Sequence, residues 1–355
     1  MNWKTLALGS AMAGFAMVGC GTSSPPGGTD SGTPMGDMGT TMPPETHTYV
    51  IGMIDTQTDN VDDAYGFNLD GMDGGPAGTC QDIMDYTSPV TGAAGVDNQL
   101  SYLAPTLDGL LGGDGVNGAI RDQIQAGSVL LMLEVSDINS FNNDSAIRVH
   151  AVLGQVSPEG AACMAHADMA SCTGDTANMC SWTAASSGTG GTCSTDATPT
   201  ASTACPGHAD QASCEGDQMN ACNWSAMASA CSGIAGGQTF AMLTDLGTVN
   251  GSITGGQISA ITDTLPLSFA AMGQTITLTL HSVQFGGHIT ATNITNGEFG
   301  AQILIAELMQ VVADLGFSID VTSFVSPDLM PNADGSTCAA LSAGMGYAAI
   351  SATLE

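Results

Sequence analysis

The stretch QTITLTL, residues 274–280, alternates polar threonine with apolar isoleucine and leucine. Successive side chains of a β-strand point to opposite faces of the sheet, so this alternation predicts an antiparallel strand with one buried and one solvated face. The sequence around it predicts more short strands, which Gly-Gly, Met-Gly and Asn-Gly turns separate. We expect these strands at residues 238–243, 251–262, 265–271, 274–285 and 288–294.

Both flanks of this β-rich region contain helices as well as strands. An amphipathic helix is expected at about 303–315 and a last strand at 341–352. Towards the N-terminus the pattern predicts a strand at 49–56, helices at about 100–110 and 116–126, and paired strands at 128–137 and 146–156. Pro105 is expected to limit or kink the first of these helices. The predicted fold class is α+β, with a curved antiparallel sheet or sandwich, a few short helices and two small disulfide-stapled repeats that interrupt it.

Two copies of one cysteine-rich module make up these repeats. CMAHADMASCTGDTANMCSW, residues 163–182, matches CPGHADQASCEGDQMNACNW, residues 205–224, and one more cysteine follows each copy. A module of about thirty residues cannot bury enough apolar surface to fold alone, so we expect two disulfides in each. The cysteines concerned are Cys163, Cys172, Cys180, Cys193, Cys205, Cys214, Cys222 and Cys231. Four cysteines allow three pairings, which the sequence leaves open, and a structural metal held by Cys and His is the alternative.

Cys80 and Cys338 remain when the repeats and one N-terminal cysteine are set aside. In an oxidising compartment these two cysteines should bond to each other. The bond would tie the start of the main domain to its end, and it would bring two acidic loops together.

The N-terminal segment has the pattern of an export signal. A short basic start and an apolar run too short to span a bilayer lead to the ending Met17-Val18-Gly19-Cys20. This ending resembles the bacterial lipoprotein signal, which implies removal of residues 1–19 and a lipid on Cys20 that anchors the protein to a membrane. Gly21 follows, instead of the aspartate that signals retention in the inner membrane. The resemblance therefore implies an outer-membrane location.

Composition divides the rest of the chain. Residues 20–47 contain the anchor and a linker rich in Gly, Ser, Thr and Pro, which cannot bury enough surface to order itself. The main domain is expected at 48–160 and 234–355, with the repeats inserted at 161–233.

Two further resemblances concern the mature chain. The lipoprotein signal, an Asp/Gly loop, GVDNQL at 95–100 and CAALSAGMGYAAI at 338–350 are together similar to predicted lipoproteins of gliding Gram-negative bacteria. That similarity implies an envelope location and no particular activity. The cysteine order in the repeats resembles the plexin-semaphorin-integrin module, which implies a spacer or a docking element.

The chain carries a formal charge of −31 and only three basic residues, of which Arg121 and Arg148 lie beyond the signal. Nucleic acids and anionic headgroups attract clustered Lys and Arg, so both are excluded as electrostatic partners. We expect no nucleic-acid partner, a membrane contact through the lipid on Cys20, and an extracellular or envelope protein or glycan as the partner of the folded part.

Two acidic loops hold the candidate metal ligands. Oxygen-bearing side chains at alternate positions followed by glycine can wrap Ca²⁺, which takes six to eight oxygen ligands. The candidates are Asp62, Asp63, Asn68, Asp70 and Asp73 in the first loop, and Asn332 and Asp334 in the second. A pair of solvated Asx turns is the alternative, because no glutamate completes an EF-hand. Ca²⁺ is the one cofactor that the sequence suggests.

No motif in the chain predicts an enzyme. It has no Gly-x-Ser-x-Gly elbow, no His-Glu-x-x-His helix and no phosphate-binding glycine loop. His281 and His288 are expected on neighbouring strands, where histidines are usually structural. The sequence favours a lipid-anchored envelope lipoprotein of binding or structural type, stabilised by calcium if the acidic loops bind it. A carrier of an apolar ligand and a carboxylate-based hydrolase are the alternatives.

Overall fold

A computed structural model describes residues 43–56, 61–83, 85–111, 114–156, 163, 165–177, 180–184, 191–195, 198–271, 274–314 and 326–355. The predicted signal peptide, the lipidation site Cys20 and most of the predicted linker lie outside these residues.

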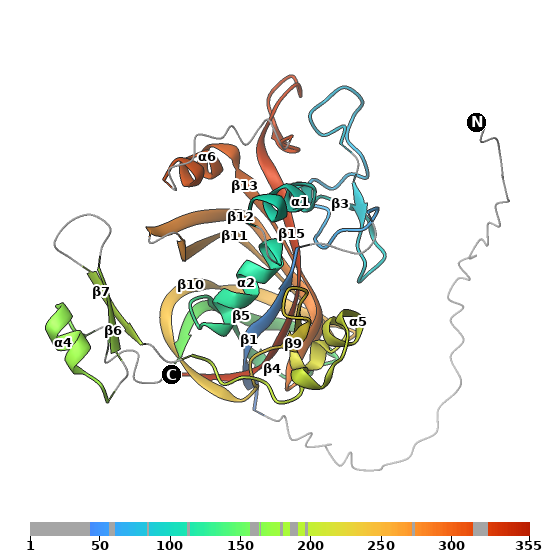
Figure 1. Ribbon diagram of the computed structural model, residues 1–355. Coiled ribbons are helices and arrows are strands. Elements are labelled where there is room, and N and C mark those ends of the chain that lie inside the picture. The colour runs from blue at the N-terminus through green and yellow to red at the C-terminus, as the bar shows by residue number, and fades with distance from the viewer. Residues whose placement is uncertain are drawn as a thin grey trace, which may run out of the picture. The chain divides into compact units, whose positions relative to one another are not determined.

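One antiparallel sheet dominates the main domain (Figure 1). Its strands are β1 (Glu45–Asp55), β4 (Leu130–Ile138), β5 (Asn143–Val156), β10 (Gln238–Thr254), β11 (Gln257–Ala271), β12 (Gln274–Ile289), β13 (Asn293–Leu304), β14 (Leu329–Pro331) and β15 (Cys338–Leu354). They lie in the order β1-β4-β5-β10-β11-β12-β13-β15-β14, and β1 also pairs with β15. The sheet therefore closes into a barrel-like ring with β14 attached to β15, which confirms the predicted curved antiparallel sheet. A short parallel pairing joins the start of β10 to the end of β15.

The helices are short, as the sequence predicts. The main domain contains α1 (Gln99–Leu111), α2 (Gly115–Gln125) and α6 (Ile305–Asp314). The repeats contain α4 (Met169–Gly174), η1 (Cys205–Gly207), α5 (Gln211–Glu215) and η2 (Gln218–Asn220). Small two-stranded sheets pair β2 (Tyr86–Thr87) with β3 (Ala94–Val96), β6 (Cys180–Ala184) with β7 (Gly191–Thr195), and β8 (Asn223–Ser225) with β9 (Ala230–Ser232). Helix α1 continues through Pro105, and no helix in the described part of the chain is long and apolar enough to cross a membrane.

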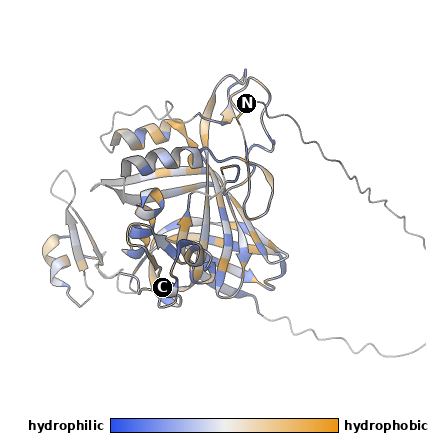
Figure 2. Cartoon of the chain, turned by 45° about the vertical axis from the view of Figure 1, so that its right-hand side comes forward, coloured by the Kyte–Doolittle hydropathy of each residue, from blue (hydrophilic) through white to orange (hydrophobic). Residues whose placement is uncertain are grey.

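Two apolar clusters explain two kinds of strand sequence. Alternate residues of the ring strands β1, β4, β5, β10, β11, β12, β13 and β15 point into the ring, where they form its main core. The opposite face of β1, β4 and β5 is also covered, by α2 and by the second repeat. Those strands are therefore continuous apolar runs such as LLML at 130–133. Strand β12 has one solvated face, so Thr277 is exposed and Leu280 is buried. Figure 2 shows hydrophilic and hydrophobic residues alternating along strands of the ring.

The β-rich region contains fewer and longer strands than predicted. The Gly255-Gly256 turn between β10 and β11 is confirmed, with φ of +59° and +82°. Gly286-Gly287 was expected to be a turn, but it lies within β12, where the register with β13 shifts. The two Asn-Gly pairs also lie inside strands, in β10 and in β13. A glycine pair serves a bulge as well as a turn, because both need positive φ, and local sequence does not separate the two.

A long segment crosses the outer face of β12, β13 and β15, and we call it the strap (residues 61–83 and 85–98). Glycines on that face leave room for its aromatic rings. A Cβ on Gly300 would lie 2.8 Å from the ring of Phe67, and a Cβ on Gly346 would lie 2.7 Å from the ring of Tyr65. Asn98 fixes the end of the strap, because its side chain exchanges hydrogen bonds with the backbone of Gly344 at 3.1 Å and donates to the Tyr65 carbonyl at 2.8 Å.

Replacing Gly344 by alanine should lower the free energy of unfolding by about 3 kcal/mol, because overpacking against a backbone atom has no cheap relaxation. The added Cβ would lie 2.0 Å from the Tyr65 carbonyl oxygen. Gly207→Ala is the matched control, since nothing lies within 4 Å of its Cβ position. Urea unfolding of both variants checks the prediction, and equal midpoints for the two would contradict the close packing of the strap.

Candidate functional site

Every cysteine of the repeats lies in a disulfide, and the two copies pair alike. The first cysteine bonds to the third and the second to the fourth. The sequence had left this choice open. One tryptophan packs against the buried disulfides of each copy, Trp182 in the first and Trp224 in the second. The expectation of disulfides is confirmed.

The other residues that the copies share are structural. Asp168 and Asp210 accept a hydrogen bond from the backbone N–H of Ser171 and Ser213, which caps the short helices α4 and α5. His166 pairs with Asp175, and His208 with Asp217, both at 2.9 Å. Each pair lies near the sulfur of a cysteine, in the spacing of a metal site. In the oxidised protein those sulfurs are in disulfides and offer no thiolate, so the described geometry favours the structural role.

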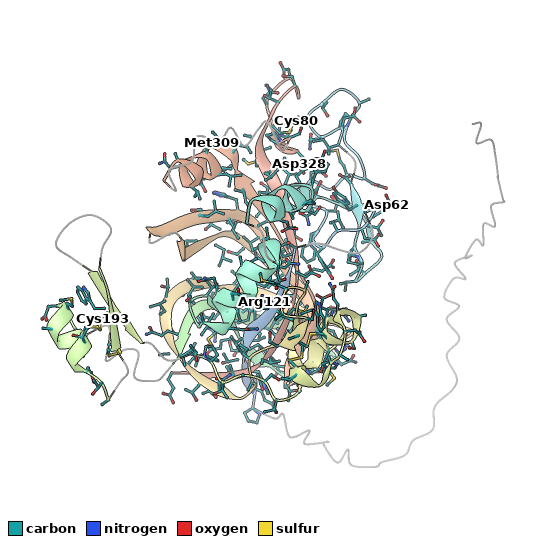
Figure 3. The ribbon with its side chains drawn as sticks, viewed as in Figure 1. Asp62, Cys80, Arg121, Cys193, Met309 and Asp328 are labelled. Atoms are coloured by element: carbon teal, nitrogen blue, oxygen red, sulfur yellow. A yellow bond between two sulfur atoms is a disulfide. The ribbon has the colours of Figure 1, made fainter. Side chains whose placement is uncertain are left out.

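The second repeat docks on the main domain through Arg121. The guanidinium donates to Asp114 and Asp122 at 2.8 Å and to the Trp224 carbonyl at 3.0 Å. Asp114 in turn accepts from the Ser225 hydroxyl at 2.6 Å and from the Met227 N–H at 2.7 Å. The Arg121 and Asp114 side chains are only 9% and 8% exposed. Arg121 belongs to α2, and Figure 3 shows it beside this repeat.

Burial raises the pKa of Asp114, but the hydrogen bonds from Ser225, Met227 and Arg121 outweigh it, and the pKa is lowered overall. Asp114 therefore stays ionised in the folded protein and holds one end of the interface. Asn223 of the repeat donates to the carbonyl of Gly52 in β1 at 2.7 Å, and Ala221 packs into the apolar cluster on the outer face of β1.

A polar cleft of about 610 Å³ lies between this repeat and the main domain. We call it the cleft. Its walls come from the end of β1, the strap, α1, α2 and α5. The carboxylates that line it are Asp55, Asp63, Asp108, Asp114 and Glu215, and the other polar side chains are Tyr65, Asn117, Gln211 and Gln218. Its size suits a small ligand, and its lining suits a cationic or hydroxyl-rich one.

Three of these carboxylates also hold local structure. Asp108 accepts the N–H of Val116 in the first turn of α2 at 2.7 Å. Asp55 accepts from the Asn117 amide at 2.7 Å, and the oxygen of that amide accepts from Thr56. Asp114 is bound to Arg121, as described above. The described hydrogen bonds thus set the cleft wall rigidly, as a binding site requires.

The predicted calcium ligands lie in separate places. Asp63 lines the cleft, and the Asp62 carbonyl accepts the Thr87 N–H at 3.1 Å. Asn68 and Asp70 make local turns with Gly71 and Met72, and Asp334 makes another with Ser336. The Asn332 side chain donates to the Ser336 hydroxyl at 3.3 Å. Within the described residues, neither acidic loop contains three Asp, Glu, His or Cys side chains whose ligand atoms lie within 4.8 Å of one another.

The Cys80–Cys338 bond is confirmed, and it joins the two acidic loops. The Cys80 N–H donates to the Gly335 carbonyl at 2.9 Å. Asp85 also has a raised pKa, first because of burial and then because of the nearby charges of Asp70 and Asp73. The carboxylates of Asp70, Asp73 and Asp85 in the first loop therefore interact electrostatically.

Sequence interpretation missed three buried carboxylates. Burial raises the pKa of Asp97 to about 7 and that of Asp328 to about 6, and it raises the pKa of Glu298 as well. Asp97 binds the N–H groups of Leu69 and Asp70, and Asp328 binds Ser342. The next residue after Asp97, Asn98, precedes α1 and accepts the Ser101 N–H at 3.0 Å.

The expectation for the two histidines was wrong. His281 and His288 lie on the same strand, β12, and not on neighbouring strands. The predicted break at Gly286-Gly287 is a bulge within that strand, which explains the error. His281 pairs with Glu307 of α6 at 3.3 Å.

We find no protein-family model, curated protein or solved structure that matches this chain. The function proposed below therefore depends on the residues and their geometry.

Proposed function

We propose that the chain is a lipid-anchored lipoprotein of the bacterial cell envelope, and that it binds an amine-bearing ligand in the cleft. The cleft carries the binding part of the proposal, because five carboxylates line a space of about 610 Å³ that the inserted repeat helps to form. Arg121, the cation nearest to it among the described residues, is already engaged by Asp114 and Asp122. A ligand with amino groups would complement the negative charge of this lining.

The envelope location is supported by five disulfides, which persist in oxidising compartments. It is also supported by the lipoprotein signal that ends at Cys20. Mass spectrometry of the mature protein expressed in a Gram-negative host tests the anchor. A diacylglycerol on Cys20 is expected, and a free N-terminal cysteine would contradict it.

Binding in the cleft is tested with spermine as the probe, by calorimetry at physiological salt. The double variant Asp63→Asn, Glu215→Gln removes two cleft charges without changing side-chain size, and it should weaken binding at least about ten-fold. A control variant, Asp82→Asn with Asp334→Asn, removes two exposed charges elsewhere. Equal weakening in both variants would mean that the affinity for spermine depends only on the formal net charge of the chain, −31, and the proposal would fail.

The two loops joined by Cys80–Cys338 are proposed to bind Ca²⁺, as the sequence suggests. The raised pKa of Asp85 supports this: burial is its main cause, and the charges of Asp70 and Asp73 add to it. A divalent cation would relieve the repulsion among these three carboxylates. Millimolar CaCl₂ should raise the melting temperature of the native chain by several degrees. The variant Asp70→Asn, Asp73→Asn should lose that rise. A rise of the same size with MgCl₂, or in the variant, would argue against a calcium site.

The two alternatives have less support. The interior of the ring contains a continuous cluster of buried apolar side chains, so no described feature there favours an apolar ligand. A carboxylate-based hydrolase would need a carboxylate kept protonated in the cleft, whereas Asp114 has a lowered pKa.

A further inference from the structure

Glu298 of β13 is a buried carboxylate beneath the strap. In the sheet register it pairs with Gly286 of β12 on one side and with Gly346 of β15 on the other. The strap covers it, since Phe67 packs over Gly286 and Tyr65 packs over Gly346. Glu298 is only 3% exposed as a result. The two glycines leave the space that a glutamate side chain needs under an aromatic cover.

The hydrogen bonds of Glu298 go to two distant parts of the strap. Its Oε1 accepts from the Ser88 hydroxyl at 2.7 Å and from the Gly66 N–H at 3.4 Å. Ser88 also accepts the N–H groups of Val90 and Thr91, so its own proton points to Glu298. One carboxylate thus joins both halves of the strap to the ring.

Both contacts adjoin residues that line the cleft. Gly66 follows Tyr65, and Ser88 precedes Pro89; Tyr65 and Pro89 both belong to the cleft wall. Tyr65 is held from the other side by Asn98. A shift of the strap at Glu298 would therefore change the wall of the cleft directly.

No cation faces Glu298 among the described residues. The groups that bear on it are the neutral donors Ser88 and Gly66. The titratable residues on the packed elements beside its contacts are Asp63, Tyr65 and Asp97 on the strap, His288 on β12 and Tyr347 on β15. None of them contributes a charge interaction to the pKa of Glu298. Arg121 and Arg148 are paired with aspartates elsewhere. The ionised carboxylate is therefore stabilised by two neutral donors and by no cation, and burial outweighs both donors.

We propose that Glu298 is a positioning residue of the cleft, and that its protonation holds the strap segments around Tyr65 and Pro89 on the ring. The effect on ligand binding rests on the proposed function of the cleft. The effect on the strap does not.

The direction of the pH dependence follows from burial. Because burial raises the pKa of Glu298 in the folded protein, protonation favours the closed strap. This stabilisation is complete below the pKa of an exposed glutamate, about 4.3. The stabilisation is lost as the pH rises from the pKa of an exposed glutamate to the raised pKa of Glu298 in the folded protein. Over that range the equilibrium constant for opening of the strap increases by up to about ten-fold per pH unit. The disulfide at Cys80 keeps the middle of the strap fixed, so the release concerns segments 61–72 and 85–91.

Hydrogen exchange of the full mature chain, without ligand, tests the proposal at pH 5, 6, 7 and 8. After correction for intrinsic rates, the two segments should lose protection as the pH rises, by several-fold or more relative to β4 and β5. The Glu298→Gln variant keeps an acceptor oxygen but cannot ionise, so its strap should stay protected at pH 8. Glu134→Gln, a half-exposed carboxylate on β4, should behave as the native chain does.

Two results would overturn the proposal: strap protection in the native chain that does not change with pH, or a pH trend in Glu298→Gln equal to the native one. If Glu298→Gln does not fold, Asp97→Asn takes its place as the comparison, because Asp97 also binds N–H groups of the strap and burial raises its pKa to about 7. A trend caused by Glu298 should persist in that variant, and its loss there would overturn the proposal. Spermine binding at pH 5 and 8 then shows whether the cleft follows the strap. If strap protection changes with pH but spermine binding does not, the result would count against the proposed function of the cleft and not against the proposal for the strap.

Discussion

Replacement of both Cys80 and Cys338 by serine is expected to lower the free energy of unfolding by about 5 kcal/mol, because the bond closes a very long loop in the unfolded chain. The two cysteines are 258 residues apart in sequence. Their bond links the strap to the first residue of β15, so its loss should also loosen the contact between Cys80 and Gly335 in the preceding turn.

Guanidinium unfolding followed by far-ultraviolet circular dichroism measures the loss, and hydrogen exchange locates it. Protection should fall first at 73–83 and at 332–337. A matched variant without the Cys172–Cys193 bond, which closes a loop of 21 residues in the first repeat, should leave the transition of the ring almost unchanged. A ring transition in the Cys80, Cys338 variant that equals the native one would show that noncovalent contacts alone hold this end.

Replacement of Arg121 by methionine should cost about 3 to 5 kcal/mol, since removal of one partner from a buried ion pair leaves the other charge uncompensated. The pair with Asp114 is almost fully buried, and Arg121 also binds the Trp224 carbonyl of the second repeat. The second repeat should therefore loosen, and residues 198–234 should become accessible to proteases before the ring unfolds.

Arg148→Met is the matched control, because Arg148 is the other arginine beyond the signal segment and its pair with Asp137 is about half exposed. An exposed pair of this kind contributes under about 1 kcal/mol. A second variant, Arg121→Met with Asp114→Leu, removes both charges and should recover part of the loss. Equal costs for the two arginine variants would contradict the role given to Arg121. Because the pKa of Asp114 is lowered, the native interface should also weaken as the pH falls through that value.

The main features of the fold could be predicted because they depend on local patterns. The alternation in residues 274–280, the apolar runs of β1 and β4 and the pairing of β4 with β5 follow from side-chain spacing. The Cys80–Cys338 bond followed from cysteine number alone. The closure of the ring could not be predicted, because the pairing of β1 with β15 depends on contacts across almost the whole described chain.

The candidate site was harder to predict. Of the carboxylates in the cleft, sequence analysis identified only Asp63, and it identified that residue as a candidate calcium ligand. Asp55, Asp108, Asp114 and Glu215 belong to four different segments, so no spacing pattern joins them. Glu298 is similar: nothing near it in sequence shows that Gly286 and Gly346 flank it or that the strap covers it. Glycines in a strand were the available signal, since they often mark a close approach by another part of the chain.

The place of β15 in the sheet affects the order in which the protein can assemble. This strand pairs with β1, β13 and β14, and at its end with β10, yet it follows all of them in the sequence. Until β15 has been synthesised, β1 and β13 present open edges, which invite pairing with other chains. The repeats form their bonds over spans of 17 to 21 residues and need no distant partner. We therefore expect the repeats to form early and the ring to close slowly and last, in the manner of folds dominated by long-range contacts.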